Sequence, residues 1–430
     1  MAAPQSRLSK PAWLAFVHKQ RDVWGMLQRL IIGMLLLWPA SAMASSEPAP
    51  QSTPPATVPA TVVVAFDRDS ITPLIVEGFA NRTSQRAVEA NDPVRIASIS
   101  KLIMALATLR LVDEGKVDLD TDVSEYLGWT LRSPNFPDAK VTLGQLLSHR
   151  AGLRDKAGYV IPLGEDLQLK LAEPGAWYAA APPGMAPFEY ANLGSPVVAT
   201  VLEAATGERY DQLVERTVFA PLDLKACFNW IECPDGLADR AVTLYRDSGE
   251  VARDDPADLP PHCTIPVVDG VECRLEDYLP GTNGSVFSPQ GGVRIGMMDL
   301  ARIGQEFLKP ASEIFLTDDT LFELMISIFE KHENQEFFCA YGLALQTIDN
   351  SPKRCQDRLF ADRKIRIGHA GEAYGLRAGL WIQMVEGTGI AYFTTAVPPR
   401  QSAEDEGGFD PREIALMARA QALLAEQNRD

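Results

Sequence analysis

The segment Ser98-Ile99-Ser100-Lys101 places a hydroxyl and an amine three residues apart, and it is the only S-x-x-K in the sequence. A serine hydroxyl attacks a carbonyl carbon readily only when a neighbouring base takes its proton. Residues three apart share one face of a helix, so the Lys101 amine can reach the Ser98 hydroxyl. A helix start adds free N–H groups and a dipole that favours negative charge. The pattern predicts a serine nucleophile with a lysine base; the alternative is a helix-capping serine beside a solvated lysine.

A second group with possible chemistry is Tyr190-Ala191-Asn192, which precedes a helix-like segment that begins at Gly194. A tyrosine beside a cationic lysine can have the pKa of its phenol lowered, which makes it a candidate general base. An asparagine two residues later can bind both the lysine and a substrate carbonyl. The alternative is a buried tyrosine followed by a turn asparagine.

The third group is His369-Ala370-Gly371, at the end of a predicted strand. Glycine there lets a substrate backbone approach the strand edge, and histidine supplies a hydrogen-bond donor or a titratable group. The alternative is a purely structural histidine. His149 is predicted to be a helix-end residue.

Taken together, these groups resemble the superfamily of serine β-lactamases and penicillin-binding proteins, in the branch of class C β-lactamases, DD-peptidases and family VIII esterases. The resemblance covers roughly residues 60–425. Its matching segments are Ile96–Lys101, Val141–His149, Phe188–Asn192, Thr206-Gly207, Pro221-Leu222, Gly291–Val293, Asp299–Ala301 and Gly368–Gly371.

The resemblance implies a role for each matching position. Ser98 would attack a carbonyl and become acylated, while Lys101 and Tyr190 share the proton transfers. Backbone N–H groups of Ser98 and Glu372 would form the oxyanion hole, and water would then hydrolyse the acyl-enzyme. The implied substrate and oxyanion residues are Asn192, His369, Gly371 and Glu372. The resemblance implies no metal and no cofactor.

The third motif departs from the Lys-Thr-Gly of β-lactamases, because Ala370 replaces the hydroxyl residue and Glu372 follows the glycine. A methyl in place of a donor, with an added carboxylate, is expected to repel an anionic substrate end. Arg377 compensates only if its side chain turns into the cleft. We therefore expect penicillins and D-Ala-D-Ala peptides to be poor substrates, and small esters, amides or substrates with a cationic amine near Glu372 to be better ones.

The elements that must position these residues are strands at both ends of the domain and helices between them. Strands are predicted at 61–66, 71–80, 341–347, 365–369, 376–383 and 389–396. Helices are predicted at 98–114, 142–148, 194–205 and 411–425. This order predicts one α+β domain, 61–425, whose sheet joins distant segments. The resemblance implies the β-lactamase/transpeptidase-like form of that fold, an antiparallel sheet flanked by helices.

Between the terminal strands, about residues 115–310 are predicted to form a mostly helical subdomain. Within it, about residues 228–285 form a loop-rich insertion, since they hold three of the six cysteines, directly after Cys227, and many Pro and Asp residues. The insertion either rims the cleft and sets specificity or only stabilises the surface.

Residues 1–44 have the pattern of a secretory signal peptide. Arg29 precedes the apolar run Leu30–Trp38, and small residues allow cleavage after Ala44. Because a membrane span needs about 20 apolar residues, the pattern favours a periplasmic or secreted protein over an uncleaved anchor.

Met26 is a candidate translation start, because the stretch from Met26 to Ala44 alone makes a conventional signal. Residues 45–60, rich in Pro, Ser and Ala, are predicted to be an extended linker.

The six cysteines fall into three pairs of sequence neighbours, and an exported protein is expected to use them as disulfides. The simplest pairing is Cys227 with Cys233, Cys263 with Cys273, and Cys339 with Cys355. A zinc site is not expected, because no C-x-x-C occurs and His262 stands alone beside Cys263.

The formal net charge of −17 argues against nucleic acid or an anionic membrane as a partner. A mean hydropathy of −0.07 argues against a protein with several membrane spans. The oligomeric state has no signal in the sequence.

The sequence thus predicts a secreted serine hydrolase that forms an acyl-enzyme on Ser98. Its substrate is expected to be a small molecule or derived from peptidoglycan, and to be an ester, an amide or a D-amino-acid peptide. One alternative is a β-lactamase or D-Ala-D-Ala carboxypeptidase. The other is a non-catalytic cell-wall or partner-binding module, against which the three intact motifs argue.

Overall fold

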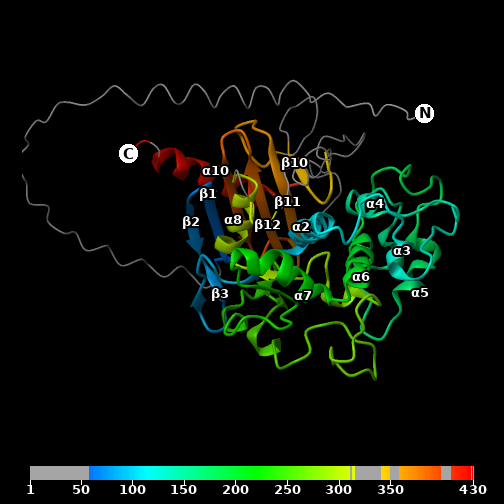
Figure 1. The fold of residues 1–430 in the computed structure, drawn as a ribbon. Coiled ribbons are helices and arrows are strands. Elements are labelled where there is room, and N and C mark those ends of the chain that lie inside the picture. Colours follow the sequence, from blue (N-terminus) through cyan, green and yellow to red (C-terminus); the bar gives the residue numbers. More distant parts are fainter. Residues whose placement is uncertain are drawn as a thin grey trace, which may run out of the picture. The chain divides into compact units, whose positions relative to one another are not determined.

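An apolar strand near the start of the domain, β1 (Thr61–Asp67), lies inside the six-stranded main sheet of the computed structural model (Figure 1). The sheet order is β10-β11-β12-β13-β1-β2, and all neighbouring strands run antiparallel. The other strands are β2 (Ile71–Glu77), β10 (Gln346–Ile348), β11 (Arg366–Ala373), β12 (Leu376–Gln383) and β13 (Thr388–Thr394). Strands from both ends of the domain therefore share one sheet, as predicted.

The structure describes residues 58–309, 312–314, 340–348, 358–398, 408–427 and 429, all within the unit Pro54–Asp430. The predicted signal peptide, nearly all of the predicted linker, and Cys339 and Cys355 lie outside the described residues.

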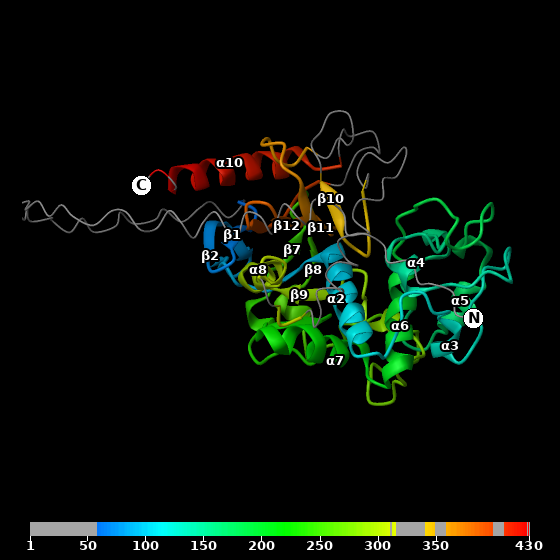
Figure 2. The ribbon, with the colours of Figure 1, turned by 45° about the horizontal axis from the view of Figure 1, so that its top comes forward.

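Both faces of the main sheet are covered because β1 is apolar on both sides. Val62 lies in a core with Leu300, whereas Val63 lies in a second core with Met417. Leu300 belongs to α8 (Met297–Glu306) and Met417 to α10 (Pro411–Gln427). Figure 2 shows α10 along one face of the sheet and α8 on the other. The predicted α+β architecture of sheet and flanking helices is confirmed.

The middle of the chain supplies the remaining helices and three small sheets. The helices are α2 (Ser100–Asp113), α3 (Ser124–Leu127), α4 (Leu143–Leu147), α5 (Leu167–Leu171), α6 (Gly194–Thr206) and α7 (Tyr210–Val214). The three-stranded sheet has the order β5 (Val94–Arg95), β9 (Val293–Ile295), β6 (Ala226–Phe228). Two hairpins pair β3 (Phe79–Asn81) with β4 (Arg86–Ala87), and β7 (Leu244–Tyr245) with β8 (Val251–Arg253).

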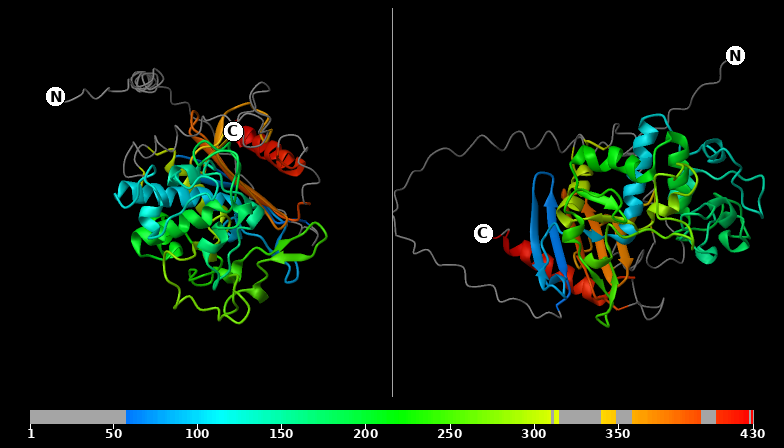
Figure 3. Two further views of the ribbon diagram at one scale, coloured as in Figure 1. Left: turned by 90° about the vertical axis from the view of Figure 1, so that its right-hand side faces the viewer. Right: turned by 90° about the horizontal axis from the view of Figure 1, so that it is seen from below.

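The stretch 115–310 is less helical than predicted. Its helices are short and long loops separate them. Strand β9 pairs with β6 inside the stretch and with β5 from outside it. The helical patterns in this stretch are short, so much of it forms loops. Several of these loops line the cleft described below. In Figures 1 and 3, helices α3 to α6 gather to one side of the main sheet.

Four predicted elements have clearly different bounds. The predicted strand 365–369 continues as β11 to Ala373, so His369-Ala370-Gly371 lies inside the strand and not at its end as predicted. Gly78, with φ of 87°, divides the predicted strand 71–80 into β2 and β3. The predicted helix 98–114 starts as the 3-10 turn η1 (Ala97–Ile99), and α2 follows it. The predicted strand 341–347 contains only the start of β10 and one bridge, because Ala344, with φ of 52°, turns the chain.

Helix α4 begins, and helix α6 ends, at residues that favour a helix boundary. Thr142 and Gln145 form a capping box at the start of α4. Gly207, with φ of 73°, ends α6 in the left-handed conformation.

None of the described helices combines the length and apolar character that crossing a membrane requires.

Candidate active site

Ser98 lies in the η1 turn, between β5 and α2, and not at the first residue of a long helix. Ala97 before it has φ of 48°, in the left-handed region. For a residue with a side chain this conformation costs on the order of 1–3 kcal/mol, and such strain is concentrated at functional sites. The turn places Ser98 in the wall of a cleft.

Lys101 is 1% exposed, and its Nζ contacts three oxygen atoms. Nζ lies 3.2 Å from Ser98 Oγ, 2.8 Å from Asn192 Oδ1 and 3.1 Å from the Gln290 carbonyl oxygen. Burial lowers the pKa of Lys101 to about 7, although the negative charge of Asp155 opposes this shift. A neutral amine can donate its two N–H groups to Asn192 and Gln290, which leaves its lone pair for the Ser98 proton. A neutral Lys101 is therefore placed to accept the Ser98 proton.

Tyr190 is hydrogen-bonded through its hydroxyl to Ser98, and its ring centroid lies 4.8 Å from Lys101 Nζ. Burial raises the pKa of the Tyr190 phenol, and the hydrogen bond to Ser98 only partly opposes this. The prediction of a lowered phenol pKa is therefore wrong, because the loss of hydration destabilises the phenolate. Tyr190 keeps its proton and is placed to pass it on.

Asn192 orients the lysine as predicted. Its Oδ1 accepts from Lys101, and its Nδ2 donates to Asp155 Oδ2 at 2.9 Å. The other oxygen of Asp155 accepts from the backbone N–H of Leu193 at 2.9 Å. Sequence reasoning missed Asp155, which is one of 57 acidic residues and belongs to no motif considered above.

His369 is 1% exposed and is committed on both ring nitrogens. Nδ1 lies 2.6 Å from the carbonyl oxygen of Ala370, and Nε2 lies 3.0 Å from the Tyr341 hydroxyl. A carbonyl only accepts, so Nδ1 carries the proton and Nε2 accepts from Tyr341. Burial and the nearby charge of Lys101 lower the pKa of His369 to about 3. His369 is therefore a neutral structural group, and the prediction of a substrate donor or titratable group is wrong.

His149 extends this chain of hydrogen bonds to the opposite wall. Its Nδ1 accepts from the backbone N–H of Ala191 at 3.3 Å, so its Nε2 donates to the Tyr341 hydroxyl, also at 3.3 Å. The Tyr341 hydroxyl in turn donates to His369. Two residues that had no predicted site role, His149 and Tyr341, thus join the Tyr190 loop to β11. His149 lies just after α4, at a helix end as predicted.

Gly371 allows β11 to approach the nucleophile turn closely. An added Cβ would lie 2.3 Å from the Ile96 carbonyl oxygen, closer than side chains tolerate. The backbone that lies against this glycine is that of Ile96. The prediction that Gly371 makes room for a substrate backbone is therefore wrong on the side of the strand where a Cβ would point.

Glu372 forms an ion pair with Arg377, its partner across the β11–β12 ladder. Arg377 Nε also lies 3.8 Å from Glu413 Oε2, and the Arg377 side chain is only 5% exposed. The charge of Glu372 is therefore balanced within the protein, which weakens the predicted repulsion of an anionic substrate end by Glu372.

Ser98 lies where two lobes of one cleft meet. Both lobes are lined by Ser98, Asn192, Glu372, Ala373 and Tyr374. The lobe that we call the His369 lobe has a volume of about 540 Å³ and adds Tyr190, His369, Ala370, Arg377, Phe409 and Glu413. The lobe that we call the arginine lobe has a volume of about 930 Å³ and adds Arg95, Tyr159, Trp230, Arg253, Asp254, Asp258 and Arg294.

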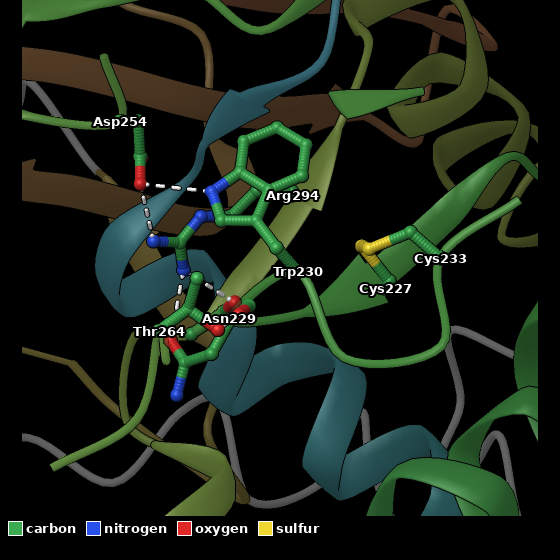
Figure 4. The surroundings of a disulfide bond; sticks show 8 residues. Cys227, Asn229, Trp230, Cys233, Asp254, Thr264 and Arg294 are labelled. Carbon is green, nitrogen blue, oxygen red and sulfur yellow. Dashed lines mark hydrogen bonds and ion pairs between the residues drawn. A yellow bond between two sulfur atoms is a disulfide. The ribbon is translucent and has the colours of Figure 1, made fainter. Parts of the chain in front are cut away.

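The cysteine-bearing insertion forms much of the arginine lobe, so it rims the cleft. Two of the predicted disulfides are confirmed, Cys227–Cys233 and Cys263–Cys273. Figure 4 shows Trp230, inside the first disulfide loop, beside Asp254 and Arg294 of the lobe. The third predicted pair lies outside the described residues. Across the described part of the chain, no three His, Cys, Asp or Glu side chains are grouped to hold a metal ion.

Comparison with known proteins shows which family the chain resembles. Residues 55–410 match the Beta-lactamase family. The chain is 34% identical over 165 residues to esterase EstB of Burkholderia gladioli, covering 35% of this chain and 42% of the relative. It is 33% identical over 140 residues to the D-alanyl-D-alanine-carboxypeptidase/endopeptidase AmpH of Escherichia coli strain K12, covering 31% and 35%. These matches span less than half the length of either relative.

Solved structures share the fold at lower identity. The D-amino acid amidase of Ochrobactrum anthropi SV3 has a TM-score of 0.60 and 19% identity, covering 86% of this chain and 95% of that chain. The class C beta lactamase of Rhodobacter sphaeroides has a TM-score of 0.60 and 16% identity, covering 87% and 96%. Together with the paired Ser98 and Lys101, these matches place the chain in the beta-lactamase family, among the β-lactamase/transpeptidase-like serine hydrolases.

Proposed function

We propose that the protein forms an acyl-enzyme on Ser98 and cleaves an ester, an amide or a D-amino-acid peptide in preference to a β-lactam. The observation that carries the proposal is the buried Lys101 amine, 3.2 Å from Ser98 Oγ, with a pKa lowered by burial to about 7. A base with a pKa near the working pH is effective in proton transfer. The relatives named above include an esterase, a carboxypeptidase and an amidase.

Acylation begins when neutral Lys101 takes the Ser98 proton and Oγ bonds to the substrate carbonyl carbon. The bond from that carbon to the leaving group then breaks. Tyr190 gives its proton to the leaving group and regains one from the Lys101 ammonium, so the enzyme returns to its starting protonation. Water attacks the ester in the second half of the cycle, with Lys101 again accepting the proton and Ser98 leaving as the hydroxyl.

The lining of the His369 lobe favours a leaving group without a negative charge. Ala370 presents a methyl there, and Arg377 already binds Glu372 and Glu413. The other charged side chains of the lobe are Arg246 and Asp247, so its carboxylates outnumber its cations. This balance supports esters, amides and cationic amines over substrates whose leaving side carries a carboxylate.

The alternative, a β-lactamase or D-Ala-D-Ala carboxypeptidase, is supported by the likeness to AmpH and to the class C enzyme. Steady-state rates on nitrocefin, p-nitrophenyl butyrate and a D-amino-acid amide separate the two. We expect the ester or the amide to give the higher kcat/KM. A nitrocefin kcat/KM well above both would favour the alternative.

Covalent labelling tests whether Ser98 reacts at all. We expect a fluorophosphonate to add one adduct mass to the protein and to leave the Ser98→Ala variant unlabelled. A correctly folded wild-type protein that takes up no adduct would instead support a non-catalytic binding module.

We also propose that the protein acts outside the cytoplasm, on a small or peptidoglycan-derived substrate. The signal-like pattern of residues 1–44 and the two disulfides, Cys227–Cys233 and Cys263–Cys273, support export. N-terminal analysis of the full-length chain after expression in an exporting bacterium should find a start at Ser45.

A further inference from the structure

The turn between β11 and β12 holds a bulky residue in a conformation that favours glycine. Tyr374 has φ of 54° and Gly375 has φ of 80°. Hairpin turns with two positive φ angles prefer Asn, Asp and Gly, and a bulky side chain there costs on the order of 1–3 kcal/mol. Tyr374 therefore pays a conformational cost to place its ring in the cleft, where it lines both lobes.

Two arginines contact the ring of Tyr374. Arg95 Cζ and Arg253 Cζ each lie 5.2 Å from the ring centroid, within the range of cation–π attraction. Arg253 also hydrogen-bonds to the phenol. Although burial raises the pKa of Tyr374, the charges of Arg95 and Arg253 outweigh it and lower that pKa. The strained tyrosine thus gathers two guanidinium groups at the wall of the arginine lobe.

The third arginine of the lobe, Arg294, is already paired. It donates to Asp254 Oδ1 at 2.8 Å, to Asn229 Oδ1 at 3.0 Å and to the Gly292 carbonyl oxygen at 2.7 Å. Trp230 Nε1 also donates to Asp254 Oδ1, at 2.9 Å, as Figure 4 shows. Asp254 and Arg294 therefore balance each other.

The lobe's other carboxylates do not balance Arg95 and Arg253. Glu372 pairs with Arg377, and Asp258 is exposed. Over the ranges that the structure describes, neither Arg95 nor Arg253 lies within 4 Å of a carboxylate oxygen. The buried Nε of Arg95 has no hydrogen-bond partner there, and its NH2 makes only a 3.4 Å contact with Asn229 Oδ1. The charge of Asp254 also acts on Arg95, so the three guanidinium groups of the lobe share two carboxylates, Asp254 and the exposed Asp258.

The position of Tyr190 decides which part of a substrate reaches these arginines. Tyr190, which passes the proton to the leaving group, lines the His369 lobe and not the arginine lobe. A leaving group protonated by Tyr190 must lie in the His369 lobe. The acyl group, on the other side of the carbonyl carbon bound to Ser98, then extends into the arginine lobe.

The insertion holds this lobe in shape. Arg253 and Trp230 belong to it, and the Cys227–Cys233 disulfide closes the loop in which Trp230 has φ of 63°. Cys263 lines the lobe and is bonded to Cys273. Two disulfide-closed loops that contribute to the lining suit a recognition site, because groups held in place before binding lose less entropy on binding.

We infer that the arginine lobe binds a carboxylate carried by the acyl part of the substrate, through Arg95 and Arg253. This inference rests on the proposed function, because it requires Ser98 to be the acylated residue. Guanidinium groups bind carboxylates through paired, charge-assisted hydrogen bonds. The preferred substrate therefore has an anionic acyl group and a leaving group without negative charge.

Two esters of matched length test the inference, p-nitrophenyl hydrogen adipate and p-nitrophenyl hexanoate. We expect the wild-type protein to have the higher kcat/KM on the adipate ester, with a preference that shrinks between 0.05 and 0.5 M NaCl. Arg253→Gln should lower kcat/KM on the adipate ester by about tenfold and change the hexanoate value less than about twofold. The matched control is Arg82→Gln, because Arg82 stacks on Tyr245 at 4.5 Å and lines neither lobe.

The results of these measurements distinguish failure of the inference from failure of the proposed function. Equal losses on both esters in Arg253→Gln, or a wild-type protein without preference for the adipate ester, would overturn the anionic subsite and leave the hydrolase proposal standing. If neither ester is hydrolysed and Ser98 takes up no fluorophosphonate, the proposed function fails and the inference fails with it.

Discussion

At the scale of single residues, the site depends on the protonation of one buried lysine. Burial lowers the pKa of Lys101, and Asp155 raises it through its charge. Asn192 connects Asp155 to the lysine, because its Nδ2 donates a hydrogen bond to Asp155 and its Oδ1 accepts one from Lys101. A residue outside all three motifs thus helps to set the pH at which the base works.

The pH dependence of acylation should report this balance. Lys101 is a base only when deprotonated, so kcat/KM on a neutral ester should rise with pH and level off above about 7. In Asp155→Asn, the loss of a negative charge should move this rise to lower pH, because the raising influence on the pKa of Lys101 is gone.

Stopped-flow or steady-state profiles from pH 5 to 9 measure the shift. Asp166→Asn is the control, because Asp166 caps α5 and contacts no site residue described above. An unchanged profile in Asp155→Asn, in a folded protein that still hydrolyses the ester, would contradict this account of the lysine.

At the scale of elements, a directed chain of hydrogen bonds connects two walls of the cleft. The Ala191 N–H donates to His149, His149 donates to Tyr341, and Tyr341 donates to His369. Ala191 precedes α6, whereas His369 lies in the middle of β11. Because each donor has one acceptor, the chain fixes both histidine tautomers and the spacing of the loop from the strand.

Removing the central hydroxyl should loosen this connection. In Tyr341→Phe, the buried His149 Nε2–H loses its acceptor, which costs about 1–3 kcal/mol of unfolding free energy. We expect kcat on a neutral ester to fall by about tenfold or more, with a smaller change in KM, because Tyr190 and Ser98 lose their relative position.

Urea denaturation and steady-state kinetics check both effects. Tyr210→Phe is the matched control, because the buried Tyr210 hydroxyl has no hydrogen-bond partner in the described ranges. The account is contradicted if Tyr341→Phe and Tyr210→Phe have the same kcat.

At the scale of the whole molecule, buried Glu203 connects the helices to the insertion. It accepts from the Tyr278 hydroxyl at 2.6 Å, the Gly281 N–H at 3.0 Å and the Tyr210 N–H at 2.9 Å. Burial nevertheless raises the pKa of Glu203 to about 7, because these donors compensate only part of the lost hydration. Glu203 lies in α6, Tyr210 begins α7, and Tyr278 lies in the insertion.

This carboxyl makes stability depend on pH in a defined direction. A carboxyl whose pKa is higher in the folded than in the unfolded protein binds protons more tightly when folded. Its contribution to the free energy of unfolding therefore falls as the pH rises from about 4.5 to about 7. The total fall is on the order of 3 kcal/mol.

Comparison of Glu203→Gln with the wild type isolates this contribution from other titrating groups. Between pH 5 and pH 8, the unfolding free energy of the variant relative to wild type should increase by most of that amount. Glu125→Gln, at an exposed position of α3, should show no such change. A difference between Glu203→Gln and wild type that does not vary with pH would contradict the prediction.

Most elements of the fold were predictable because their signals are local. The apolar run of β1, the capping box at Thr142 and the glycine after α6 each depend on nearby residues only. Two of the errors in element bounds occur where the backbone is left-handed. Gly78 splits a predicted strand, and Ala97 begins a 3-10 turn where a helix was predicted.

The sequence by itself determined that Ser98 and Lys101 meet, because residues three apart share a helix face, and Lys101 Nζ lies 3.2 Å from Ser98 Oγ. It also determined the α+β class and two disulfides between sequence neighbours. These properties follow from local spacing and side-chain chemistry.

Only the tertiary structure decided the pKa shifts of Lys101 and Tyr190, the hydrogen bonds of His369 and the grouping of two arginines in the cleft. Burial, which no local pattern specifies, lowers the pKa of Lys101 and raises that of Tyr190. Contacts between residues far apart in sequence engage His369 with Tyr341 and bring Arg95 and Arg253 to the ring of Tyr374. Charge and hydration at a site depend on these distant neighbours, so they are properties of the folded chain.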